Sequence, residues 1–280
     1  LDTLVKRLLE EAKATTESTE AKDDVVESST KLNKAQLHAA KRTEATLKNI
    51  KKDKSGLERL ATSEGFILGI AIDSMENIFA CEMKEASIYK YNKKENSFKE
   101  FAKGPKIPNY PVIDEKRNSL YVSDSFGFNE KGIGVYKFDL DTGNGGPCSN
   151  ELFNFANGMC LSPDSKYMYV VESMHPCISR MIINDDGSFG KKEIFTDNIA
   201  TVPDGLAFDK NNNLFISCYE PSRIYMADQS GNCKILIEDS HCTVMAHPTN
   251  IVISEDGNTM YTSNLGRWHI TEIDISSLYI

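Results

Sequence analysis

One strand–turn–strand pattern recurs five times between residues 69 and 265, and it limits the fold more than any other feature of the sequence. In each copy a short apolar segment ends in Asp or Ser, a polar turn follows, and an alternating segment rich in Phe, Tyr, Val and Ile comes next. The copies are GIAIDSMENIFACEM (69–83), YPVIDEKRNSLYVSDS (110–125), GMCLSPDSKYMYVVES (158–173), GLAFDKNNNLFISCYE (205–220) and NIVISEDGNTMYTSNL (250–265). Their Asp or Ser positions are 41, 48, 47 and 45 residues apart.

Further strand-like segments follow most copies. The third strands are expected at ASIYKYN, GIGVYKFDL, CISRMII, SRIYMAD and HITEIDI, and the outer strands at SFKEFAK, NELFNF, KKEIFT and CKILIED. The GNGG segment at 143–146 is interpreted as a loop. Four strands at this period are typical of a β-propeller. A β-sandwich also spaces short strands regularly, but it does not need one four-stranded unit five times. We therefore predict an all-β protein, a β-propeller with five visible blades over residues 55–280.

The last copy ends without an outer strand. The segment GLERLATSEG (56–65) precedes the first copy and is the expected replacement, because a propeller that pairs its two chain ends leaves no open sheet edge.

Residues 1–54 differ in composition from the rest of the chain. They contain no Gly, Pro, Phe, Tyr or Trp, and Leu4, Leu8, Leu9 and Ala12 have helical spacing. Two helices or one partly disordered arm are both consistent with this pattern. We expect an N-terminal α-helical arm that mediates self-association or binds a protein partner.

Composition excludes several classes of function. No apolar run approaches the roughly 20 residues that span a bilayer, and the chain opens with no secretory apolar segment. The net charge is −9 and the strand-rich part has no basic stripe, so nucleic acid is not an expected partner. Seven cysteines without a CxxC pair indicate a reducing compartment, and a cytoplasmic location is expected, with a leader already removed as the alternative.

Asn or Asp precedes three of the apolar segments at the same register. The residues at this position are Leu68, Asn109, Asn157, Asp204 and Thr249. Because the innermost strands of a propeller line its channel, equivalent positions should converge near one end of the axis. One carboxylate with amide oxygens suits a hard divalent cation such as Ca²⁺ or Mg²⁺, and also Mn²⁺. We expect Ca²⁺ first, with Mn²⁺, Mg²⁺ or Zn²⁺ as alternatives. The alternative is that Asn and Asp cap turns before the strands.

At these positions the sequence resembles a known family. The segments PNYPVIDEKRNSLYVSDSFG, FANGMCLSPDSKYMYVVES, VPDGLAFDKNNNLFISCYE and HPTNIVISEDGNTMYTSNLG look like blades of the senescence marker protein / gluconolactonase / luciferin-regenerating enzyme family. The resemblance implies six blades and one divalent cation in the channel, and many members hydrolyse lactones. It also implies that Asn157 and Asp204 are metal ligands and that Asn109 contacts the substrate or a water on the metal.

One departure from the family pattern concerns the first blade. The family opens that blade with Glu-Gly-Pro, and its Glu is a metal ligand, whereas Leu68, Gly69 and Ile70 stand at the visible equivalent here. The segment beginning at residue 69 is more similar to the family's second blade. The usual first blade is therefore expected to be absent, which weakens cation binding.

Two functions follow from these residues. The first is a metal-dependent hydrolase that opens a lactone or a related ester, with Asp204 as the catalytic general base. Asp124 and Tyr219, which end second strands, are expected to contact the substrate together with Asn109. The alternative is a non-catalytic propeller that acts as a ligand-binding or protein-interaction platform, with the helical arm mediating assembly.

Overall fold

The computed structural model describes residues 60–267 and 269–279. The expected helical arm at 1–54 lies outside them. In the described part, no helix is long and apolar enough to cross a membrane.

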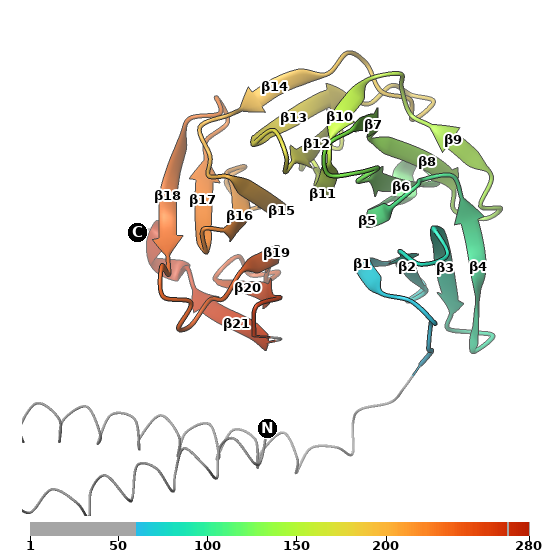
Figure 1. Ribbon diagram of the computed structural model, residues 1–280, viewed down its shortest axis with the longest axis horizontal. Coiled ribbons are helices and arrows are strands. Elements are labelled where there is room, and N and C mark those ends of the chain that lie inside the picture. The colour runs from blue at the N-terminus through green and yellow to red at the C-terminus, as the bar shows by residue number, and fades with distance from the viewer. Residues whose placement is uncertain (1–59, 268, 280) are drawn as a thin grey trace, which may run out of the picture. The chain divides into compact units, whose positions relative to one another are not determined.

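Five antiparallel sheets account for most of the described chain, and we call them blades 1 to 5 in chain order (Figure 1). Blade 1 contains β1 (Ile67–Ile72), β2 (Ile78–Glu82), β3 (Ser87–Asn92) and β4 (Ser97–Lys103). Blade 2 contains β5 (Pro108–Asp114), β6 (Ser119–Asp124), β8 (Val135–Asp139) and β9 (Gly145–Pro147). Blade 3 contains β11 (Ala156–Leu161), β12 (Tyr167–Glu172), β13 (Cys177–Ile182) and β14 (Glu193–Thr196).

Blade 4 contains β15 (Val202–Phe208), β16 (Leu214–Glu220), β17 (Arg223–Ala227) and β18 (Cys233–Glu238). Blade 5 has three strands, β19 (Pro248–Ile253), β20 (Thr259–Asn264) and β21 (His269–Asp274). A separate two-stranded sheet pairs β7 (Lys131–Ile133) with β10 (Leu152–Asn154), and two 3₁₀ helices cover Glu115–Arg117 and Ser276–Tyr279. The predicted all-β propeller with five blades is therefore confirmed.

The outer strand of blade 2 is not the one predicted. The segment expected there, NELFNF, forms β10 and pairs with β7, while part of the predicted loop GNGG forms the outer strand β9. Glycine allows this segment to pair closely with β8, because a Cβ at Gly145 would lie 1.9 Å from the carbonyl oxygen of Lys137. Phe153 of β10 is instead fully buried in the core cluster shared by blades 2 and 3.

The turns after the first strands explain why Asp or Ser recurs there. In blade 1 the Asp73 carboxylate accepts hydrogen bonds from the backbone N–H groups of Met75 and Asn77. In blade 5 the Ser254 hydroxyl accepts one from the backbone N–H of Thr259. Short oxygen-bearing side chains of this kind close tight turns. In blade 2 the equivalent Asp114 instead accepts a hydrogen bond from the Arg117 side chain.

The core lies between neighbouring blades. Phe79 and Ile88 of blade 1, for example, pack against Leu120 and Phe138 of blade 2, and all four are fully or almost fully buried. Similar clusters join each later pair of blades. Burial of this apolar surface fixes the order of the blades around the axis.

The innermost strands contact one another in the series β1, β5, β11, β15 and β19, and the series follows an open arc (Figure 1). Apolar side chains are exposed on both terminal blades, with Ile70 and Ile72 of β1 at 54% and 60% and Ile270 of β21 at 72%. Within the described residues, β21 pairs only with β20, and Leu60 to Gly65 form no strand. The predicted closing strand is therefore wrong for this part of the segment, and the six blades implied by the resemblance are not confirmed.

Candidate active site in the propeller channel

The polar residues predicted to share one register do share it. Every innermost strand begins with a register shift against its neighbour, immediately after Ile67, Pro108, Ala156, Pro203 and Pro248. The next residue in each blade belongs to the predicted set, namely Leu68, Asn109, Asn157, Asp204 and Thr249. Asn109, Asn157 and Asp204 therefore lie at equivalent bulge positions on three consecutive inner strands, β5, β11 and β15. A bulge re-aims a side chain relative to the regular strand, and bulges are enriched beside active sites.

Two serines fix the orientation of the two amides. The Asn109 Nδ2 donates to Ser125 Oγ at 2.8 Å, and Ser125 Oγ donates to the carbonyl oxygen of Ala156 at 3.0 Å. In the next blade Asn157 Nδ2 donates to Ser173 Oγ at 3.1 Å, which donates to the carbonyl oxygen of Pro203 at 2.7 Å.

This arrangement repeats from blade to blade, and in the described part of the chain no group hydrogen-bonds to Oδ1 of Asn109 or Asn157. Each serine connects one amide to the residue just before the next bulge, so the three bulge positions are held side by side. Because both amide nitrogens are engaged, both Oδ1 atoms keep their capacity to accept a hydrogen bond or bind a cation.

Asp204 stands next in this series and has no comparable partner. Among the described residues, no side chain forms an ion pair with its carboxylate and no donor hydrogen-bonds to it. The residue keeps a small exposed surface, but burial of the carboxylate raises its pKa to about 8. An isolated buried carboxylate is costly to ionise, and a bound cation is one way to relieve that cost.

Glycines bring the neighbouring bulges into contact. A Cβ at Gly158 would lie 2.2 Å from the carbonyl oxygen of Asp204. A Cβ at Gly205 would lie 2.7 Å from Oδ1 of Asn250. The inner strands β11, β15 and β19 therefore approach so closely at this level that only glycine fits between them.

Two residues depart from this glycine pattern, and sequence reasoning missed both. The position after the bulge residue is Gly69, Gly158 and Gly205 in three blades, but Tyr110 in blade 2 and Asn250 in blade 5. Asn250 Nδ2 donates to Tyr110 Oη at 3.0 Å, although the two residues are 140 positions apart. Alignment of the five bulges would have identified these residues as the exceptions.

The other residues assigned to the site have different surroundings. The Asp124 carboxylate is buried and accepts hydrogen bonds from the backbone N–H groups of Lys106, Ile107 and Phe126. These contacts hold the loop before β5. The ring of Tyr219 stacks on His247 at 4.7 Å between centroids. Within the part of the chain that the structure describes, neither side chain contacts Asp204, so their roles toward a substrate stay predictions.

The two remaining bulge positions, in blades 1 and 5, differ in the atoms that they offer. Thr249 Oγ1 shares a hydrogen bond with Ser263 Oγ at 2.9 Å. Leu68 offers no ligand atom and is 37% exposed. In the described part of the chain, no group of three or more His, Cys, Asp or Glu side chains is placed to hold a metal. A cation in the channel would therefore depend on amide oxygens as well as on Asp204.

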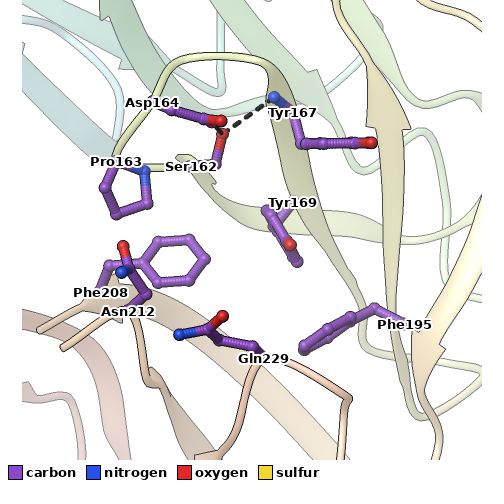
Figure 2. Close-up of a pocket in the computed structure, with 9 residues that line it drawn as sticks. All are labelled: Ser162, Pro163, Asp164, Tyr167, Tyr169, Phe195, Phe208, Asn212 and Gln229. Atoms are coloured by element: carbon purple, nitrogen blue, oxygen red, sulfur yellow. Dashed lines mark hydrogen bonds between the residues drawn. The ribbon is translucent and has the colours of Figure 1, made fainter.

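A groove of about 340 Å³ lies elsewhere, between blades 3 and 4 (Figure 2). Figure 2 shows the rings of Tyr169, Phe195 and Phe208 around it. It lies next to Ser162, which follows β11, and Phe208, which ends β15, whereas Asn157 and Asp204 are near the starts of these strands. The groove is therefore at the opposite end of the strands from the candidate site.

A known protein family matches the central and C-terminal part of the propeller. The family described as SMP-30/Gluconolactonase/LRE-like region matches residues 134–265, which include the bulges of blades 3, 4 and 5. The propeller contains an SMP-30/gluconolactonase/LRE-like region. The family resemblance seen in the sequence is thus confirmed, whereas the absence of the family's first blade stays a prediction.

Curated relatives of this region include two staphylococcal lactonases. The lactonase drp35 of Staphylococcus epidermidis is 27% identical over 177 residues, which is 55% of this chain and 54% of the relative. The Staphylococcus aureus protein of the same name is 26% identical over 175 residues, with the same coverage. The chain thus spans about half the length of the curated relatives it matches.

Solved structures match over a longer part of the chain. A gluconolactonase from Xanthomonas campestris has a TM-score of 0.61 at 17% identity, and the match covers 77% of this chain and 75% of that one. A chain of a nidogen/laminin complex has a TM-score of 0.63 at 16% identity, with 75% and 76% covered. At these identities the likeness establishes the propeller fold of the SMP-30/gluconolactonase/LRE-like region and does not distinguish an enzyme from a binding protein.

Proposed function

We propose that this protein is a hydrolase that opens a lactone or related ester ring, with one divalent cation bound in the propeller channel. The observation that supports it most is the half-buried Asp204 carboxylate, which has no ion-pair or hydrogen-bond partner among the described residues and lies on the inner strand next to that of the oriented Asn157 amide. The names of the staphylococcal and Xanthomonas proteins point to the same substrate class.

The donor atoms fit a hard cation. Asn157 Oδ1 and the Asp204 carboxylate would hold it, because oxygen ligands are what Ca²⁺, Mg²⁺ and Mn²⁺ prefer. When bound, the cation would polarise the ester carbonyl as a Lewis acid. Its positive charge would also favour the ionised form of Asp204 and so lower the pKa of that carboxylate.

The residues of the channel orient the substrate and transfer the proton. Asn109 Oδ1, held by Ser125, accepts a hydrogen bond from a substrate hydroxyl and orients the ring. Asp204 accepts a proton from the attacking water as general base. The water oxygen bonds to the carbonyl carbon, the ring C–O bond breaks, and the proton on Asp204 passes to the leaving alkoxide. The product is a hydroxy acid.

Thermal unfolding with added cations tests the first half of this proposal. A cation at 100 times its Kd stabilises the folded state by about 2.7 kcal/mol, which raises the Tm by several degrees. We expect this rise over EDTA with Ca²⁺, or with Mn²⁺, Mg²⁺ or Zn²⁺, and its loss in Asp204→Ala. Glu255→Ala, which removes an exposed carboxylate, is the control and should keep the rise. The same rise in Asp204→Ala would contradict the assignment.

Lactone hydrolysis tests the second half. Acid release from glucono-1,5-lactone, followed at constant pH, should exceed the spontaneous rate with the cation and fall to that rate in EDTA. Since the probe is one member of a class, γ- and δ-lactones with aliphatic substituents complete the panel. A cation-dependent rise in Tm without turnover of any of them would rule out the hydrolase.

A non-catalytic platform is the second candidate, and Leu68 is the observation that favours it. Because a leucine stands at this bulge position, the inner strand β1 supplies no ligand atom to a cation in the channel. The exposed Ile70 and Ile72 on the same strand offer apolar surface to a partner. An absent response to all four cations would favour this reading over the hydrolase.

A further inference from the structure

The hydrogen bond between Tyr110 and Asn250 crosses the channel. Tyr110 lies on β5 and Asn250 on β19, and two other inner strands, β11 and β15, stand between them in the series. Figure 1 shows β5 and β19 facing each other across the middle of the arc. The phenol of Tyr110 therefore reaches the far side of the channel from its own blade.

The partners of this bond leave one proton without an acceptor. Asn250 Oδ1 accepts from the backbone N–H of Ile251 at 2.9 Å, so its Nδ2 is the group that faces Tyr110. The Tyr110 oxygen is thus an acceptor in this bond, and a phenol keeps one O–H of its own to donate. Among the described residues, no acceptor takes that proton.

The hydroxyl group of Tyr110 lies near Asp204. Asn250 packs against Gly205, which follows Asp204 in the chain. Burial, with a smaller contribution from the charge of Asp204, raises the pKa of Tyr110 above its ordinary value. The hydroxyl consequently stays protonated at neutral pH and remains a donor.

We propose that the Tyr110 hydroxyl is a further catalytic group that donates a hydrogen bond to the carbonyl oxygen of the ester as it becomes an oxyanion. The inference rests on the proposed hydrolase function. Tyr110 keeps its proton throughout, because Asp204 takes the proton of the water and returns it to the alkoxide. Asn250 is a positioning residue, since it holds the phenol oxygen across the channel.

Tyr110→Phe is the informative variant, because it removes one hydroxyl and keeps the ring that packs against the core shared by blades 2 and 3. Loss of one oxyanion donor costs about 10²–10³-fold in kcat. We expect kcat on glucono-1,5-lactone to fall by about 10²-fold, with KM changed less than about threefold. The rise in Tm with Ca²⁺ should persist, since Tyr110 is not proposed as a ligand.

Tyr91→Phe is the matched control. Its hydroxyl also bonds to an asparagine, Asn96, but in a blade 1 hairpin away from the inner strands, and the ring is 8% exposed. This variant should match the wild type in kcat. Asn250→Ala should show a smaller loss than Tyr110→Phe, because the phenol stays but is less well oriented.

The possible outcomes separate this inference from the proposed function. Wild-type turnover with an unchanged kcat in Tyr110→Phe would overturn the donor role and leave the hydrolase standing. Loss of the Ca²⁺ response in Tyr110→Phe would overturn it too, because the residue would then act through the cation site. Absence of wild-type turnover would remove the hydrolase and the donor role together.

Discussion

Ser173 determines which end of the Asn157 amide is left for the proposed cation. Its hydroxyl accepts a hydrogen bond from Asn157 Nδ2 at 3.1 Å and donates one to the carbonyl oxygen of Pro203 at 2.7 Å. Asn157 is 7% exposed, so the amide has few alternative partners. The oxygen of Asn157 is therefore held ready for a ligand by a residue that would not touch that ligand, as outer-shell partners commonly do at metal sites.

Removal of this hydroxyl should weaken cation binding. In Ser173→Ala the amide of Asn157 loses its acceptor, and we expect the apparent Kd for the cation to rise by about 10-fold. The measurement is the dependence of Tm on cation concentration. Because the buried carbonyl of Pro203 also loses its donor, the Tm in EDTA should fall too, and only the concentration dependence reports on the site.

The Ser125→Ala variant tests whether Asn109 contacts the substrate or is a metal ligand. It breaks the equivalent bond to Asn109, which is proposed to orient the substrate. This variant should raise KM for the lactone several-fold and leave the apparent Kd of the cation unchanged. An equal loss of cation affinity in both serine variants would instead make Asn109 a ligand.

The unpartnered carboxylate of Asp204 should make stability depend on pH in the absence of metal. Its pKa is about 8 in the folded protein, against an ordinary value of 3.8. The folded state favours the protonated form of Asp204. The stability that depends on this proton is therefore fully present below about pH 4 and is lost as the pH rises toward 8. In EDTA the Tm of the wild type should therefore fall between pH 5 and pH 8 relative to that of Asp204→Asn. We expect a difference on the order of 2 kcal/mol.

Other carboxylates act in a separate pH range and do not obscure this effect. The Asp239 carboxylate accepts backbone N–H groups of Val244 and Met245, which lowers its pKa. Its contribution is present above about pH 4 and is lost only at lower pH. Saturating Ca²⁺ should remove the difference in Tm between wild type and Asp204→Asn. If Tm in EDTA depended on pH in the same way for both proteins between pH 5 and pH 8, the carboxylate of Asp204 would be solvated.

Close approach of the inner strands should make Gly158 intolerant of substitution. An added Cβ would lie 2.2 Å from the carbonyl oxygen of Asp204, and both groups belong to inner strands that cannot easily move. Gly158→Ala should therefore destabilise the protein by about 3 kcal/mol or more and reduce cation affinity, because Asp204 shifts. Gly146→Ala, where nothing lies within 4 Å of the new Cβ, is the matched control for chemical denaturation. Similar denaturant concentrations at the midpoint of unfolding for the two variants would contradict the packing argument.

Local repetition explains which parts of this fold could be predicted. The turn residues such as Asp73 and Ser254, and the bulge residues such as Asn157, recur at one period, so five copies reveal a common position. NELFNF was misassigned because its apolar alternation also suits a strand that buries Phe153 between blades. The bond between Tyr110 and Asn250 depends on how the blades curve around the axis, and no local pattern encodes a contact over 140 residues.

A carboxylate introduced at the first bulge should strengthen the cation site. Leu68 lies at the position equivalent to Asn109, Asn157 and Asp204, on the inner strand that contacts β5. We expect Leu68→Glu to lower the apparent Kd for Ca²⁺ by about 10-fold, because the added oxygen ligand also balances the charge of the ion. In EDTA the same variant should be less stable at pH 8 than at pH 5, since two carboxylates would then share the channel. Leu68→Gln is the control for size and polarity, and an equal Kd in both variants would show that this position does not reach the cation.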